Sequence, residues 1–160
     1  SIRGLRDRDS RSARTRSRLP ETGNLVVASP SLCLDTDICI DVLRGARSLG
    51  DLARADVPTQ AMWISAITLA ELGYGVARSR WPERERAELT ALLGSVGVRE
   101  FGSRAAEVAG AVRARLAAMG AGIGALDSLI GAHALAEGAV LMTRNIREFS
   151  RIPGLAIAEA

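Results

Sequence analysis

The chain has 160 residues, of which 48% are hydrophobic, so it is long enough for one domain with a substantial core and too short for two ordinary ones. Its 21 basic residues are all arginine, and the lack of lysine excludes Schiff-base lysines, P-loop lysines and Ser-Lys dyads. Apolar runs span only a few residues, whereas a transmembrane helix needs about 20, so we expect a soluble, cytoplasmic protein with no membrane partner.

Residues 1–24 are basic and poor in apolar side chains. They carry seven arginines and three acids, a net charge of +4, whereas residues 25–160 carry a net charge of −1. Such a composition cannot bury enough apolar surface to fold, so we expect a disordered tail followed by one domain over residues 25–160. An arm attracted to nucleic-acid phosphates is one interpretation of the tail. The interpretation we favour is upstream sequence included by a misplaced start.

The rest of the chain alternates between short apolar strands and helices. In chain order we expect a strand at 31–35, a helix at 37–44, a short helix at 47–55, a strand at 62–65, helices at 67–77 and from 82 to about 93, a strand at 96–101, helices at 103–119 and 125–137, and strands at 139–143 and 155–158. This alternation predicts an α/β fold with a central parallel sheet of about five strands and helices on both faces.

Several residues in these elements are expected to be structural. Ser103 is the expected cap of the helix at 103–119, whose buried stripe should consist mostly of Ala106, Val108, Ala109, Val112 and Leu116. Cys33 and Cys39 fall in apolar runs and are expected to be small buried residues without a chemical role. His133 is about 240° around its helix from Asp127, so we expect a packed histidine rather than a catalytic one.

Three carboxylates occupy positions that a parallel sheet can bring to one edge. Asp35 ends the first strand, Glu71 lies in the helix after the second strand, and Asp127 lies in the first turn of the helix at 125–137. Ligand sites of α/β folds gather beyond the carboxyl ends of the strands. Because clustered carboxylates repel one another unless a cation offsets them, we expect a hard divalent ion there, Mg²⁺ or alternatively Mn²⁺, and phosphodiester hydrolysis as the reaction.

Each acid also has a structural explanation, which the residues alone leave open. Asp35 can cap the following helix, and Glu71 stands three residues after Thr68, as in a capping box. Asp127 is favoured by the helix dipole without any ligand. The segment from Asp35 to Asp37 also resembles the Asp-x-Asp motif of haloacid-dehalogenase-like phosphatases, but the rest of that pattern is missing.

Four sequence blocks carry a more specific resemblance: LDTDICIDVLRG, ISAITLAELGYGVA, IGALDSLIGAHALA and LMTRNIREFSRIPGL. With these blocks in this order, residues 31–158 resemble a PIN-domain ribonuclease of the VapC type, the toxin of a bacterial type II toxin-antitoxin pair. The resemblance implies a Mg²⁺-dependent endoribonuclease, an RNA substrate and a VapB-type antitoxin that blocks the acidic pocket. It also implies a homodimer, for which the helices at 37–44 and 67–77 offer apolar faces.

The resemblance also implies which residues form the site. Asp35, Glu71 and Asp127 match the metal-binding acids, and Asn145 matches a fourth position that is acidic or an amide in the family. Because Asn145 removes one charge, one firmly held ion is the expectation, and a catalytically weak PIN-like module that binds RNA or a partner is the alternative function.

Three further residues are expected beside the metal site. Thr36 and Thr143 match hydroxyl positions that would hold a water or a phosphate, although such hydroxyls can equally satisfy local backbone groups. Arg144 is the arginine expected to contact RNA phosphates. Asp37 and Asp41 are four residues apart on a helix, and we interpret them as an exposed charged face outside the site.

Overall fold

The computed structural model describes residues 30–53 and 58–160, so the predicted basic tail lies outside the described residues. The strands are β1 (Leu32–Leu34), β2 (Met62–Ser65), β3 (Gly97–Arg99), β4 (Val140–Thr143) and β5 (Ala156–Glu159). The helices are α1 (Thr36–Leu43), α2 (Leu49–Leu52), the 3₁₀ helix η1 (Thr59–Ala61), α3 (Ala66–Ala77), α4 (Pro82–Ser95), α5 (Ser103–Ala118), α6 (Ala125–Ala136) and α7 (Ile146–Phe149). None of the helices within these two ranges is both long and apolar enough to cross a bilayer.

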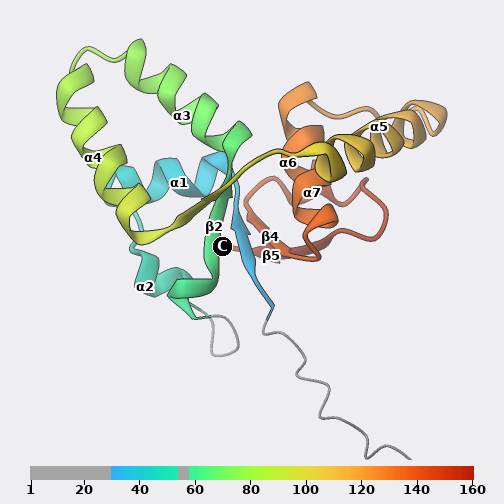
Figure 1. Ribbon diagram of the computed structural model, residues 1–160, viewed down its shortest axis with the longest axis horizontal. Coiled ribbons are helices and arrows are strands. Elements are labelled where there is room, and N and C mark those ends of the chain that lie inside the picture. Colours follow the sequence, from blue (N-terminus) through green and yellow to red (C-terminus); the bar gives the residue numbers. More distant parts are fainter. Residues whose placement is uncertain (1–29, 54–57) are drawn as a thin grey trace, which may run out of the picture.

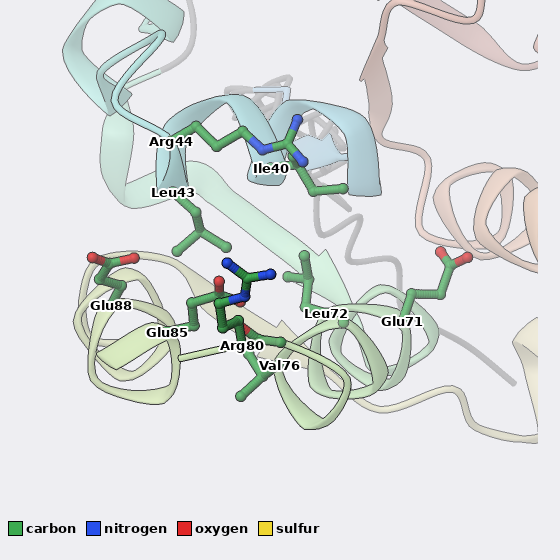
Figure 2. A pocket seen from close by; sticks show the side chains of 11 residues that line it. Ile40, Leu43, Arg44, Glu71, Leu72, Val76, Arg80, Glu85 and Glu88 are labelled. Atoms are coloured by element: carbon green, nitrogen blue, oxygen red, sulfur yellow. The ribbon is translucent and has the colours of Figure 1, made fainter. Parts of the chain in front are cut away.

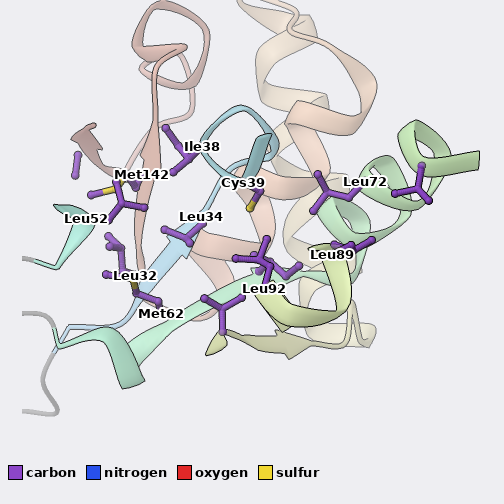
Figure 3. Packing of buried hydrophobic residues seen from close by; sticks show 14 residues of the cluster. Leu32, Leu34, Ile38, Cys39, Leu52, Met62, Leu72, Leu89, Leu92 and Met142 are labelled. Atoms are coloured by element: carbon purple, nitrogen blue, oxygen red, sulfur yellow. The ribbon is translucent and has the colours of Figure 1, made fainter. Parts of the chain in front are cut away.

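The strands form one parallel sheet with helices on both faces (Figure 1). On one face, Leu34 and Ile64 belong to a core that includes residues of α1, α2, α3 and α4 (Figure 3). On the other face, Cys33, Trp63 and Leu141 pack with residues of α5, α6 and α7. Successive strand residues point to opposite faces, and both faces are buried, which explains why the strands are apolar throughout. The predicted α/β fold is confirmed.

The strand order places the carboxyl ends of β1 and β4 side by side. The order is β3-β2-β1-β4-β5, so the chain moves outward from β1 to β3 and then returns to the other side of β1 with β4. Leu34 pairs with Met142, and the next residue, Asp35, donates its backbone N–H to the Met142 carbonyl at 3.0 Å. In open α/β sheets such a switch point is where ligands bind.

Two details of the predicted helices are wrong. The N-cap of α5 is Gly102, and Ser103 is already the first helical residue. The buried stripe of α5 is Ala105, Ala109, Val112 and Leu116, whereas Ala106 is exposed. Beginning the stripe one residue earlier gives spacings of four, three and four residues, which keep it on one side of the helix. The short helices η1 and α7 were not predicted.

His133 is buried, as predicted. Its side chain is 1% exposed, and Nδ1 lies 2.9 Å from the hydroxyl oxygen of Ser65. The rings of Trp63 and Phe101 pack edge-on against the imidazole. Burial lowers the pKa of His133, which favours the neutral ring. The histidine therefore joins α6, which carries Asp127, to the start of α3, which carries Glu71. Cys33 and Cys39 are also buried free thiols.

Candidate active site

Asp35 lies between β1 and α1, where it both caps the helix and contacts β4. Its Oδ1 accepts a hydrogen bond from the Thr36 N–H at 2.8 Å, and its Oδ2 accepts one from the Thr143 hydroxyl at 2.7 Å. The residue is only 5% exposed. The capping explanation is therefore correct for one carboxylate oxygen, while the other oxygen is held by a residue at the end of the neighbouring strand.

The surroundings of Asp35 disfavour its charged form. Burial raises the pKa of Asp35 from 3.8 to about 6, even though the Thr143 hydroxyl and the Thr36 N–H stabilise the carboxylate. The negative charges of Asp37 and Asp127 raise this pKa further. These three acids thus lie close enough to repel one another, and a bound cation would relieve the repulsion at neutral pH.

Glu71 is joined to the start of α1. Its Oε2 accepts a hydrogen bond from the Thr36 hydroxyl at 2.5 Å. The N-cap of α3 is Ser65, whose hydroxyl accepts the Ile67 N–H, and Thr68 lies inside the helix. The capping-box explanation of Glu71 is therefore wrong, because the carboxylate is directed to another element instead of to the end of its own helix.

Asp127 lies in the first turn of α6 against the backbone of Gly124. A Cβ built on Gly124 would lie 2.9 Å from Oδ2 of Asp127, so the carboxylate occupies the space of the missing side chain. Burial raises the pKa of Asp127, and so do the charges of Glu148 and Glu71 and a side-chain hydrogen bond with Glu148. Asp127 is therefore electrostatically coupled both to the predicted acid on α3 and to an acid on α7.

The turn between β4 and α7 carries the remaining predicted residues. Thr143 is completely buried, its hydroxyl donates to Asp35, and its oxygen accepts the Asn145 N–H at 2.9 Å. A fully buried hydroxyl cannot contact a substrate, so the structure assigns Thr143 to holding Asp35. Thr36 likewise donates its hydroxyl to Glu71. Asn145 is the N-cap residue of α7, yet its side chain makes no capping hydrogen bond.

Asp37 and Asp41 are not the exposed charged face that we predicted. Their side chains are only 26% and 14% exposed, and both pair with Arg144. Nε of Arg144 lies 3.4 Å from Oδ2 of Asp37, and Nη1 lies 3.5 Å from Oδ2 of Asp41. The predicted RNA contact of Arg144 stays a prediction, because the guanidinium is directed towards α1 while its side chain remains 52% exposed.

The residues at this edge fit a partly hydrated divalent ion better than a fully protein-enclosed one. Within residues 30–53 and 58–160, no three His, Cys, Asp or Glu side chains are placed so that together they could hold a metal ion. Mg²⁺ usually takes only one or two carboxylates and keeps several waters. Among the described residues, Oδ1 of Asp37 is buried without a hydrogen-bond partner. The charge of Asp37 also raises the pKa of the nearby Asp35 and Asp127. An uncompensated buried oxygen beside repelling carboxylates is the environment that a hard cation stabilises.

Comparisons with known proteins show the family of this chain. The family model described as the PIN domain matches residues 32–155. The tRNA(fMet)-specific endonuclease VapC of Salmonella typhimurium is 38% identical over 126 residues, which cover 79% of this chain and 95% of that protein. The chain belongs to the PIN-domain family, in its VapC group. Ribonuclease VapC2 of Haemophilus influenzae is 38% identical over 122 residues, which cover 76% of this chain and 92% of the relative.

A solved structure resembles this VapC chain in both fold and sequence. The structure of VapBC2 from Rickettsia felis, bound to a DNA fragment from the promoter of the pair, matches with a TM-score of 0.73 and 33% identity. The match covers 81% of this chain and 98% of the other. The likeness therefore extends over most of this chain and nearly all of the other chain.

The sequence analysis did not identify two residues that lie beside the candidate site. Glu148 lies on α7 and is coupled to Asp127, and Gly124 gives the Asp127 carboxylate its space. A signal for α7 was present, because Asn145 and Glu148 have the spacing of an N-cap residue and its third helical residue. No comparable signal marks Gly124, which lies in a loop with two other glycines.

A groove beside the site leads away from Glu71 between α1, α3 and α4 (Figure 2). Its apolar lining comes from Ile40, Leu43, Leu72 and Val76, and its volume is about 470 Å³. Arg44, Arg80, Glu85 and Glu88 add charges of both signs along it. Glu71 lies at one end, so a chain segment seated in this groove would pass next to the acids.

Proposed function

We propose that this VapC chain is a metal-dependent endoribonuclease that hydrolyses RNA phosphodiester bonds at the acidic edge of its sheet, as the toxin of a toxin-antitoxin pair. The observation that carries the proposal is the buried Asp35 carboxylate, held by Thr143 of the adjacent strand and repelled by Asp127 and Asp37. Repulsion between clustered carboxylates destabilises the fold, so such a cluster is not expected around an acid that is only structural. Around a metal-binding acid it is expected, because the bound cation offsets the repulsion. The names of the relatives, an endonuclease and a ribonuclease, support the same reaction class.

Asp35, Glu71 and Asp127 would surround one Mg²⁺ ion, with Mn²⁺ as the alternative and Asn145 as a neutral fourth group. Asp35 and at least one of the other two acids would bind the ion directly. The bound ion would supply a Lewis acid for phosphodiester hydrolysis. Asn145 adds an amide where an acid would add a charge, so a second ion would have one fewer carboxylate to bind it. A single firmly held ion is the consequence that we propose for this chain.

The other residues at the edge hold the acids in place. Thr143 fixes the direction of Asp35, and Thr36 fixes that of Glu71, each through one hydroxyl hydrogen bond. Both threonines start or end an element of the fold, so the two acids are oriented by rigid backbone. Preorganised oxygens of this kind avoid the cost of reordering side chains when an ion or a phosphate arrives.

The groove between α1, α3 and α4 suits the antitoxin. Its apolar lining and mixed charges fit an amphipathic segment, and the end at Glu71 would let that segment cover the acids. The solved relative from Rickettsia felis is a VapBC2 complex, which supports a VapB-type partner for this chain. The predicted homodimer stays a prediction.

RNA cleavage by the purified chain tests the proposed function. We expect cleavage of at least one RNA in a panel of structured tRNAs and rRNA fragments, with initiator tRNA tested first because a relative is named for it. Cleavage should require Mg²⁺ or Mn²⁺ and should stop when EDTA is added, because the acids need the ion to organise the reaction. Gel analysis of end-labelled RNA measures both effects.

The same assay separates the enzyme from a binding module. A catalytically weak module would retain RNA in a filter-binding assay without any metal-dependent product. If no RNA of the panel were cleaved with either ion, or if cleavage continued unchanged in EDTA, the proposed function would be wrong.

A further inference from the structure

We propose that Asp37 is a positioning residue, which holds the turn between β4 and α7 through the backbone N–H of Arg144. The inference rests on the proposed function, because this turn carries Thr143 and Asn145 of the candidate site. The sequence alone indicates no role for Asp37, yet its carboxylate makes a contact across 107 residues of chain.

Hydrogen bonds inside the turn between β4 and α7 set its local shape. Inside it, the Asn145 N–H is bonded to the Thr143 hydroxyl oxygen, and the Asn145 carbonyl accepts the N–H groups of Glu148 and Phe149. These bonds shape the turn without attaching it to the rest of the protein. The Thr143 hydroxyl attaches one end by donating to Asp35 at 2.7 Å.

Asp37 provides a further attachment, at Arg144. Oδ2 of Asp37 accepts the Arg144 N–H at 3.1 Å, and the same oxygen lies 3.4 Å from Nε of Arg144. Asp35 and Asp37 flank the first residue of α1, so the start of this helix holds Thr143 with one acid and Arg144 with the other. Asn145 follows directly, and its position depends on both bonds.

The backbone hydrogen bond of Asp37 differs in its effect from the ion pair with Arg144. The Arg144 side chain is half-exposed, and an ion pair in that setting contributes little because water and salt screen it. A backbone N–H cannot move away without moving the turn, so its hydrogen bond fixes the position of the chain. An asparagine in place of Asp37 could still accept that hydrogen bond through its amide oxygen, whereas alanine could not.

The test compares Asp37→Ala, Asp37→Asn and Arg144→Ala by amide hydrogen exchange and by RNA-cleavage kinetics. In Asp37→Ala we expect the amides of residues 144 and 145 to exchange at least about tenfold faster, and kcat to fall by about ten- to a hundredfold with little change in KM. Asp37→Asn should restore the protection of these amides, because its amide oxygen can accept the same hydrogen bond from the Arg144 N–H. In Arg144→Ala the amide of residue 144 should stay protected, because the backbone N–H remains.

Asp41→Ala is the matched control, because Asp41 lies on the same helix and pairs with Arg144 without touching the backbone of the turn. It should leave exchange and kcat as in the wild type. The proposal is overturned if Asp37→Ala changes neither property, or if these amides exchange as fast in Asp37→Asn as in Asp37→Ala while the melting temperature of Asp37→Asn matches the wild type. Hydrogen exchange needs no RNA, so it tests the attachment even if the proposed ribonuclease activity fails.

Discussion

Replacing Asp35 with asparagine is expected to abolish metal-dependent RNA cleavage and, in the same protein, to stabilise the metal-free fold at neutral pH. The amide would keep the size of the side chain but lose the charge that the divalent ion needs. Loss of the several kcal/mol that such an ion contributes to the transition state corresponds to a decrease in kcat on the order of a thousandfold. Asparagine caps a helix about as well as aspartate does, so a loss of cleavage in this variant could not be attributed to a lost cap.

The sign of the stability change follows from the raised pKa of Asp35. Burial raises this pKa from 3.8 to about 6, so between these pH values the folded state binds the proton more tightly than the unfolded state. The free energy of unfolding therefore falls as the pH rises from about 4 through about 6, and it stays low above that range. This fall in the free energy of unfolding amounts to at most about 3 kcal/mol. Asparagine would recover it, because its side chain carries no charge.

Thermal unfolding of the metal-free proteins at pH 5 and pH 7.5 measures this effect. Wild-type protein should melt at a lower temperature at pH 7.5 than at pH 5, and Asp35→Asn should remove most of that difference. Adding Mg²⁺ should raise the melting temperature of the wild type and leave Asp35→Asn unchanged. Glu107→Gln, an exposed acid on α5, is the control and should behave as the wild type. An Asp35→Asn protein that cleaves RNA at the wild-type rate would remove Asp35 from the site.

Replacing Gly124 with alanine is expected to reduce cleavage by about a hundredfold while leaving the fold intact. The new Cβ would lie 2.9 Å from Oδ2 of Asp127, so the carboxylate must move. A displacement of about 1 Å at a catalytic group can cost about a hundredfold in rate. The backbone of Gly124 has φ −51° and ψ 144°, which alanine adopts without strain, and a movable side chain takes up the clash.

Gly122→Ala is the matched control for Gly124→Ala. It lies two residues earlier in the same loop, and a Cβ built there meets nothing within 4 Å. Both variants should melt within a few degrees of the wild type, and only Gly124→Ala should lose activity and apparent affinity for Mn²⁺. Equal activity of the two variants would mean that the position of Asp127 is not critical, which would argue against Asp127 as a metal-binding acid.

The approach of the predicted acids to one another could be predicted because it follows largely from the order of strands and helices along the chain. Asp35 comes directly after an apolar strand, and a parallel sheet fixes where the ends of such strands meet. The pairing of β1 with β4 then brings Thr143 next to Asp35, at a separation of 108 residues. The alternation of strands and helices was sufficient for this part of the fold.

The contacts within the site could not be predicted, because they depend on side-chain direction. Thr36 and Thr143 were expected either to hold a water or a phosphate or to satisfy local backbone groups, and their hydroxyls donate to Glu71 and Asp35. A hydroxyl can rotate towards any of these partners, and only the packed structure decides which one it takes. The helical spacing of Asp37 and Asp41 predicts an exposed acidic face. The contact of Asp37 with Arg144 could not be seen in that spacing, because Arg144 lies 107 residues further along the chain.

Locating a bound Mn²⁺ ion in crystals of the wild-type protein is the most direct test of the proposed metal site. Anomalous scattering near the manganese absorption edge shows the ion without relying on enzyme activity. We predict one strong peak at the carboxyl ends of β1 and β4, within about 2.0–2.5 Å of carboxylate oxygens of Asp35 and at least one of Glu71 and Asp127. A peak only at another site, or none at Mn²⁺ concentrations that support RNA cleavage, would contradict the proposed site.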